Sequence, residues 1–187
     1  MRRRTRIIRM AALGLALGAS MAPATAAFAA NTSGTATITA GTLAITTPAT
    51  VTFAATLNAN DQTVNATQAL DVLDGTGAAA GWKITATSTT FTSGANTLPT
   101  SAVTVQSTPT NSCDASTTCT LATNAVAFPY TLPAAAVAPA ATSMYNAAIG
   151  TGMGAQTPTA TVRLAIPAST KAGVYTSTWT YSIVTGP

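Results

Sequence analysis

The sequence contains no histidine and no glutamate, and it has few charged or aromatic residues. Without histidine the chain lacks the usual general base for a serine or cysteine nucleophile, and it lacks a common zinc ligand. Its only acidic residues are four aspartates. The two closest in sequence are Asp71 and Asp74, and a turn at Asp74-Gly75 explains this pair better than acid/base chemistry does. The sequence therefore predicts a protein that is not an enzyme and that uses neither a metal nor another cofactor.

Positive charge is concentrated in the first nine residues, where arginine occupies positions 2, 3, 4, 6 and 9. An apolar run follows over Met10–Ala19, and Ala-Phe-Ala stands at 27–29. A basic start, a short apolar centre and an Ala-x-Ala end indicate a secretory signal peptide over 1–29, with Ala-Thr-Ala at 24–26 as an alternative cleavage site. The other interpretation is an uncleaved amphipathic anchor. The apolar run is shorter than the about 20 residues that span a bilayer.

Removal of 1–29 would change the charge of the protein. Three cations, Lys83, Arg163 and Lys171, then stand against the four aspartates, which leaves a net charge of −1. No basic patch remains, so the sequence argues against nucleic-acid binding. The remaining chain also has no apolar stretch of about 20 residues, so we expect no transmembrane segment in the mature protein.

Two cysteines, Cys113 and Cys119, lie in the segment SCDASTTC. In an exported chain such a pair predicts a disulfide, and no histidine is present to complete a zinc site. The loop that this bridge would close is small, so the chain-entropy model assigns it about 2–2.5 kcal/mol. We expect it to fix a local loop, and the rest of the fold not to depend on it.

Short segments with alternating apolar residues, separated by turn residues about every ten positions, run through the rest of the chain. This pattern predicts one all-β domain over 33–187, an antiparallel Ig-like β-sandwich. The cluster at 58–63 reads as a turn, and 134–154 reads as a loop with at most one helical turn, because prolines and glycines interrupt it. The expected strands are 35–47, 49–57, 70–73, 82–91, 101–107, 125–133, 159–167 and 173–184.

The last expected strand carries an unusual face. Tyr175, Trp179, Tyr181 and Ile183 lie at positions of the same parity, while threonine and serine occupy the other parity. Alternate side chains of a strand point to the same side, so this division predicts a half-buried strand with the aromatic face turned mainly inward. The alternative is that the aromatic face is a binding surface.

Two tryptophan motifs carry a family resemblance. Trp82-Lys83-Ile84 lies mid-chain, and Trp179-Thr180-Tyr181 lies in the last expected strand, with LAITTPATVTFAATLN and DVLDGTGAAAGW before them and Gly-Pro after them. With this context the chain resembles the WxL-domain surface proteins of Gram-positive bacteria over about 33–187. It departs from that pattern at Ile84 and Tyr181, which stand where leucine is expected.

The resemblance implies a secreted protein held non-covalently on the cell wall, with peptidoglycan or another wall polymer as ligand and a membrane-anchored surface protein as a further partner. Trp82, Ile84, Trp179 and Tyr181 are then the candidate binding residues, with a role in the core as the alternative. A structural or assembly subunit that docks on another surface protein is the second hypothesis. Ice or mineral binding by flat threonine arrays is weaker, because the Thr-x-Thr pairs keep no fixed period.

Overall fold

The computed structural model describes residues 30–187, and the predicted signal peptide lies outside the described residues. The chain divides into two units, Met1–Thr37 and Ile38–Pro187. In the first unit, 30–37 are exposed and have no regular secondary structure. All strands belong to the second unit, to which the following description is confined.

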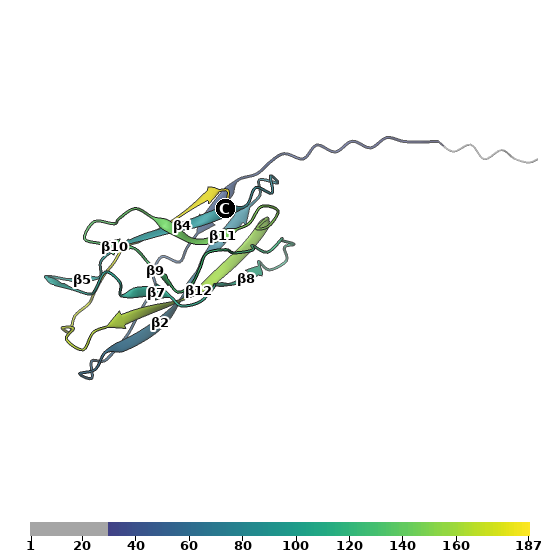
Figure 1. The fold of residues 1–187 in the computed structure, drawn as a ribbon. Coiled ribbons are helices and arrows are strands. Elements are labelled where there is room, and N and C mark those ends of the chain that lie inside the picture. The colour runs from purple at the N-terminus through teal and green to yellow at the C-terminus, as the bar shows by residue number, and fades with distance from the viewer. Residues whose placement is uncertain (1–29) are drawn as a thin grey trace, which may run out of the picture. The chain divides into compact units, whose positions relative to one another are not determined.

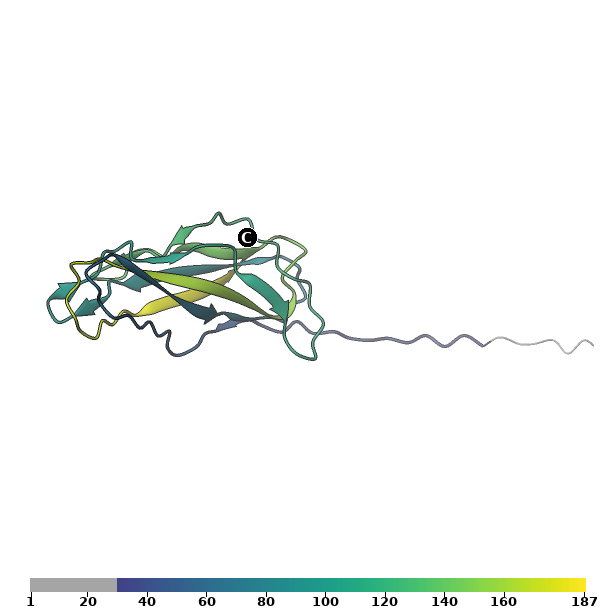
Figure 2. The same ribbon diagram turned by 90° about the horizontal axis from the view of Figure 1, so that it is seen from below.

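The second unit consists of strands and loops, and neither view shows a helix over 30–187 (Figures 1 and 2). Almost all strand pairs are antiparallel. The predicted all-β class is confirmed, while its closer likeness to an Ig domain stays a prediction. The strands are β1 Leu43–Thr46, β2 Gln62–Ala69, β3 Asp71–Asp74, β4 Trp82–Thr89, β5 Thr92–Ser93, β6 Asn96–Thr97, β7 Val103–Val105, β8 Thr110–Cys113, β9 Tyr130–Thr131, β10 Ala134–Ala135, β11 Thr142–Ala147, β12 Gly154–Ile166 and β13 Trp179–Thr185.

The larger sheet is built around β12. On one side β12 pairs with β2 and β3 in a single register, and the Leu70 amide between them donates to the Pro158 carbonyl at 2.9 Å. On the other side it pairs with β8 and β7, and β9 pairs with the far edge of β7. The strand β1 pairs with β3 and extends the sheet beyond it. The long β12 therefore holds strands from every part of the second unit.

The smaller sheet is built around β4. The strands β11 and β13 flank it on opposite edges in antiparallel pairing, and the short β10 pairs parallel with the end of β4 on the β11 side. In Figure 1, β10, β4 and β11 lie above β7, β12, β2 and β8. A separate hairpin, β5–β6, follows β4.

The core lies between the two sheets. Both sheets contribute side chains at alternate positions, as expected for strands with one buried face. From β4 these are Trp82, Ile84 and Ala86, and from β12 they are Ala160, Val162 and Leu164. The remaining buried apolar residues are Leu70, Val72, Leu98, Ala102, Val103, Val105, Tyr130, Leu132, Met144, Tyr145 and Ala147.

The structure corrects two of the expected loops. The segment 134–154 contains β11, which places Met144 and Tyr145 in the core on consecutive positions. A register shift between Ser143 and Tyr145 breaks the alternation, and this irregularity hid the strand in the sequence. The expected turn at 58–63 also ends early, because β2 begins at Gln62. This strand is rich in polar residues, so it lacked the apolar alternation by which strands are recognised.

Several expected strands are shorter than predicted, and one is unpaired. Of 125–133 only Tyr130–Thr131 is a strand, and 101–107 and 173–184 are reduced to Val103–Val105 and Trp179–Thr185. Only Leu43–Thr46 of the segment 35–47 is a strand, since its partner β3 has four residues. The segment 49–57 keeps the expected alternation, with Val51 and Phe53 more buried than their neighbours. Within 30–187, however, 48–60 makes no backbone–backbone hydrogen bond to any strand. Side-chain packing and a hydrogen bond from the Gln62 Nε2 of β2 to the Thr56 carbonyl at 2.9 Å hold this segment, which we call the unpaired segment 48–60.

Candidate functional site

The two tryptophan motifs lie on neighbouring strands. Residues of β13 pair with β4 so that Ile183 faces Ile84 and Tyr181 faces Ala86. Paired residues share a face, so the aromatic side of β13 continues the inward face of β4. Trp179, Tyr181 and Ile183 are partly buried and pack against the core. The prediction that this face turns mainly inward is confirmed.

Trp82 is a core residue with no exposed surface. Its indole Nε1 donates to the Gly152 carbonyl at 2.8 Å, and its ring centroid lies 6.1 Å from that of Tyr145. Gly152 has a φ of 80°, and a Cβ added there would lie 2.5 Å from the Trp82 Nε1. The glycine-rich segment 150–154 therefore makes room for Trp82 and satisfies its N–H.

Ile84 is also fully buried. The structure thus places Trp82 and Ile84 beneath the surface, where they fix the position of β4, and it places Trp179 and Tyr181 nearer to solvent on the adjoining strand. The assignment of all four as binding residues stays a prediction. The structure brings them together on one face and separates them by depth.

Trp179 lies in an aromatic cluster with Phe53 and Phe91. Its ring centroid is 6.1 Å from that of Phe53 and 6.2 Å from that of Phe91, and the latter pair is edge-to-face. The two phenylalanine rings are themselves 6.3 Å apart. The Trp179 indole Nε1 is shielded from solvent, yet it has no hydrogen-bond partner among the described residues. A shielded donor without a protein acceptor is uncommon, and it is a group to which a water molecule or a ligand could bond.

The sequence did not single out Phe53 or Phe91, although both lay on expected strands. Phe53 comes from the unpaired segment 48–60, and Phe91 follows β4. Their aromatic character and parity were visible in the sequence. Their approach to Trp179 depends on how the chain segments assemble.

Tyr181 is the second residue of the β13 motif that lies near the surface. Burial raises the pKa of its phenol above the ordinary value of 10.0, and the charge of Tyr130 raises this pKa further. The phenol therefore stays neutral at physiological pH. It can act as a hydrogen-bond donor or acceptor without carrying charge.

The outer edge of β13 has no hydrogen-bonded partner strand among the described residues, although β1 packs close to β13. Thr89 N donates to the Thr178 carbonyl and Gly186 N donates to the Gly81 carbonyl. In antiparallel pairing such bonds recur at every second residue, so even-numbered residues of β13 bond to β4. The backbone groups of Trp179, Tyr181, Ile183 and Thr185 consequently face the open edge.

The predicted disulfide joins Cys113 and Cys119, with Cα atoms 5.6 Å apart. The loop that it closes is tied to the start of β12, because Asp114 N donates to the Ala155 carbonyl and Thr120 N to the Met153 carbonyl. The bridge is therefore local, as the spacing predicted. It also lies away from the tryptophan motifs in the chain.

Asp74 serves the turn that the sequence predicted. Its Oδ1 accepts hydrogen bonds from the Thr76 amide at 3.0 Å and the Thr76 hydroxyl at 2.6 Å. Over 30–187, no cluster of three histidine, cysteine or acidic residues could hold a metal ion. No helix in that part of the chain is long and apolar enough to cross a membrane.

Fold and site together define the class of this protein: an all-β domain in which two tryptophan motifs adjoin on one face, with an aromatic cluster at an open sheet edge. The family model of the WxL domain, described as surface cell wall-binding, matches residues 29–187, and the chain belongs to this family. The protein is therefore extracellular and associated with the cell wall. No curated protein and no solved structure matches the chain.

Proposed function

We propose that the protein is secreted, has no catalytic activity and binds peptidoglycan non-covalently through the face that carries Trp179 and Tyr181. The observation behind this is the shielded Trp179 Nε1, which has no acceptor among the described residues. Aromatic rings suit sugar polymers because they combine a broad apolar face with a polar group at the edge. Trp82 and Ile84 act in this proposal by holding β4, the neighbouring strand, in place beside β13.

Access to Trp179 follows from the segment beside it. Phe53 contacts the Trp179 ring, and Phe53 belongs to the unpaired segment 48–60. Displacement of that segment breaks no backbone ladder, so its free-energy cost is limited to side-chain packing and the hydrogen bond from Gln62 to the Thr56 carbonyl. A wall polymer that moves Phe53 aside would reach the indole N–H.

The substitution Trp179→Phe tests this proposal. It keeps an aromatic ring but removes an N–H that has no partner in the described residues, so we expect little change in the melting temperature and weaker co-sedimentation with purified peptidoglycan. Trp82→Phe is the matched control, since it removes an N–H that is bonded to Gly152 and should lower the melting temperature.

Two results would contradict the proposal. One is a stable Trp179→Phe protein that sediments as well as the wild type. The other is retention by intact walls but not by peptidoglycan stripped of its attached polymers, which would make another wall polymer the ligand.

A second candidate function is that of an assembly subunit that docks on a membrane-anchored surface protein. The outer edge of β13 favours it, because an extended partner segment that enters beside β1 can add to a strand whose outward backbone groups are unpaired. Thr185→Pro would remove an outward N–H and block such pairing, whereas Val184→Pro would break the ladder to β4. We expect Thr185→Pro to keep the fold and lose capture of the anchored protein. Unchanged capture would exclude this edge as the docking site.

A further inference from the structure

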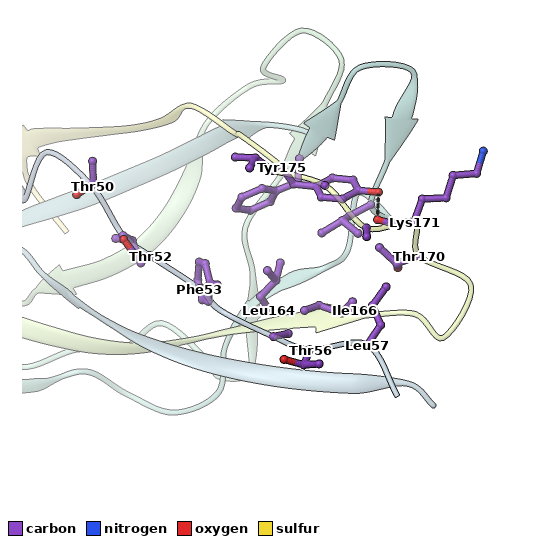
Figure 3. Close-up of a pocket in the computed structure, with 17 residues that line it drawn as sticks. Thr50, Thr52, Phe53, Thr56, Leu57, Leu164, Ile166, Thr170, Lys171 and Tyr175 are labelled. Atoms are coloured by element: carbon purple, nitrogen blue, oxygen red, sulfur yellow. Dashed lines mark hydrogen bonds between the residues drawn. The ribbon is translucent and has the colours of Figure 1, made fainter. Parts of the chain in front are cut away.

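A pocket of about 670 Å³ lies beside the aromatic cluster, between the unpaired segment 48–60 and the loop that precedes β13 (Figure 3). Its wall is largely apolar and includes Phe53, Leu57, Leu164 and Ile166. The volume lies within the range of about 300–1,000 Å³ that is typical of small-molecule sites. The site thus has the size and chemistry to bury an apolar chain.

The mouth of the pocket also exposes apolar side chains. Leu57 is 41% exposed and Val174 is 83% exposed, and both line the pocket. Large aliphatic side chains at an opening lose contact with water when a ligand covers them. The exposed apolar side chains at this opening would therefore be shielded from water only when a ligand occupies the pocket.

A second hollow, of about 500 Å³ and with a more polar lining, adjoins the first. The two share Leu98, Thr170, Lys171 and Tyr175. In the part of the chain that the structure describes, Lys171 is the one charged residue that lines either space, and no acidic side chain lines them. A single positive charge thus stands where the apolar and polar spaces meet.

The loop that carries Lys171 is held in place. The Tyr175 hydroxyl donates to the Lys171 carbonyl at 3.0 Å. A Cβ on Gly173 would lie 2.6 Å from the Ser93 Oγ, so glycine permits the loop to pack against the β5–β6 hairpin. Figure 3 shows the Lys171 side chain leading outward beside Tyr175, while Phe53, Leu57 and Ile166 line the space within.

We propose that this pocket binds a single-chain anionic amphiphile with the chemistry of a fatty acid. Its alkyl chain lies on the apolar wall, and its carboxylate lies at the mouth beside the Lys171 ammonium. Sugar hydroxyls placed against Phe53, Leu164 and Ile166 would lose water without gaining hydrogen-bond partners, so an alkyl chain suits this part of the wall better. The pocket shares Phe53 and Phe91 with the aromatic cluster at Trp179, but this proposal does not rest on wall binding at that cluster.

Binding of the alkyl chain is tested by titration calorimetry. The secreted protein is titrated with straight-chain alkanoates of six to twelve carbons, below their micelle concentrations. Each added methylene that enters the pocket should tighten Kd about fourfold, with a negative heat-capacity change. An affinity that does not change with chain length would overturn the proposal. So would binding to anionic lipid vesicles without binding to any soluble alkanoate.

The charged head is tested with Lys171→Gln. We expect about a tenfold weaker Kd for decanoate and little change for decanol, because the lost contact is charge-assisted. Lys83→Gln is the matched control, since Lys83 lies on β4 and lines neither hollow. Equal effects of the two substitutions would show that Lys171 has no special role and would overturn the assigned position of the head.

The pocket itself is tested with Leu57→Gln. We expect weaker binding of every alkanoate, whereas Leu73→Gln should have no effect, because Leu73 is similarly exposed at 47% but lies on β3 outside the pocket. Val174→Gln provides a second pocket variant at a residue whose side chain is mostly in solvent. Unchanged affinity in both pocket variants would place the ligand elsewhere and overturn the proposal.

Discussion

At the scale of single residues, depth separates the roles of the two tryptophans. Trp82 is fully buried and its N–H is bonded to Gly152, so it contributes apolar burial and a satisfied hydrogen bond. Trp179 keeps some exposure, and its N–H has no acceptor among the described residues. Similar sequence motifs thus place the two indoles at different depths and satisfy only one of their N–H groups.

The first prediction concerns Gly152. Gly152→Ala should destabilise the fold strongly, because the backbone there has a φ of 80° and the new Cβ would lie 2.5 Å from both the Ala147 Cβ and the Trp82 Nε1. We expect a loss above about 2 kcal/mol in urea unfolding. Gly150→Ala is the control, since it shares a φ of 80° but has open space around its Cβ. Equal losses in the two variants would mean that backbone conformation, and not contact with Trp82, sets the cost.

The second prediction concerns alkaline pH. Burial raises the pKa of Tyr130, Tyr145 and Tyr181 above 10.0 in the folded state. The native protein therefore binds more protons than the unfolded chain above pH 10, so the free energy of unfolding should be constant below that pH and fall above it. Tyr181→Phe should make the fall less steep in unfolding experiments from pH 8 to 12. An equally steep fall would show that Tyr181 does not contribute to it.

At the scale of elements, β12 and β4 organise their sheets, and the pieces around them differ in how firmly they are held. The strand β13 makes a full ladder with β4. The unpaired segment 48–60 makes no backbone ladder within the described chain, although it carries the alternation of a strand. Elements without a backbone ladder open at lower cost than paired strands. Both proposed contacts lie beside this segment.

The third prediction concerns the loop of the disulfide. The double substitution Cys113→Ser with Cys119→Ser should lower the free energy of unfolding by about 2–2.5 kcal/mol and leave the far-ultraviolet circular dichroism unchanged. The reason is that the bridge closes a short loop tied to β12 by its own backbone bonds. Intact mass would verify that the wild type lacks two hydrogens relative to its reduced form. Global unfolding of the double variant would contradict a local role.

At the scale of the whole molecule, scarcity of charge is the dominant property. Residues 30–187 carry three cations and four carboxylates, of which only Asp71 and Asp74 share a strand. Long-range electrostatic attraction to a charged polymer is therefore weak. Association with the wall must rely on apolar and hydrogen-bonding contacts at short range.

The fourth prediction follows from this scarcity. Raising NaCl from 0.05 to 0.5 M should change wall co-sedimentation of the wild-type protein less than twofold, because screening acts on charges that the contact does not use. A basic protein bound to the same walls provides the control and should be released. A steep loss of retention by salt would indicate ionic binding and contradict the proposed contact.

The sequence by itself determined the all-β class, the disulfide and the family, because these follow from local features. Alternation of side chains, the Asp74-Gly75 turn and the paired cysteines act over a few residues, and the family pattern reads along the chain. The same alternation predicted that Trp179 and Tyr181 face inward. The alternation also predicted a strand at 49–57, and this prediction was wrong. An alternating segment becomes a strand only when it pairs with the edge of another strand.

Only the tertiary structure decided the depth of each tryptophan, the pairing of β13 with β4, the strand at 142–147 and the pocket beside Lys171. Each depends on contacts between segments far apart in the chain: Trp82 meets Gly152, Trp179 meets Phe53, and a register shift hides β11. Local propensity carries no information about such contacts, since they arise when the two sheets close on one core. The sequence could name the four candidate residues of the two motifs but not Phe53 or Phe91, and only the fold could rank them by depth.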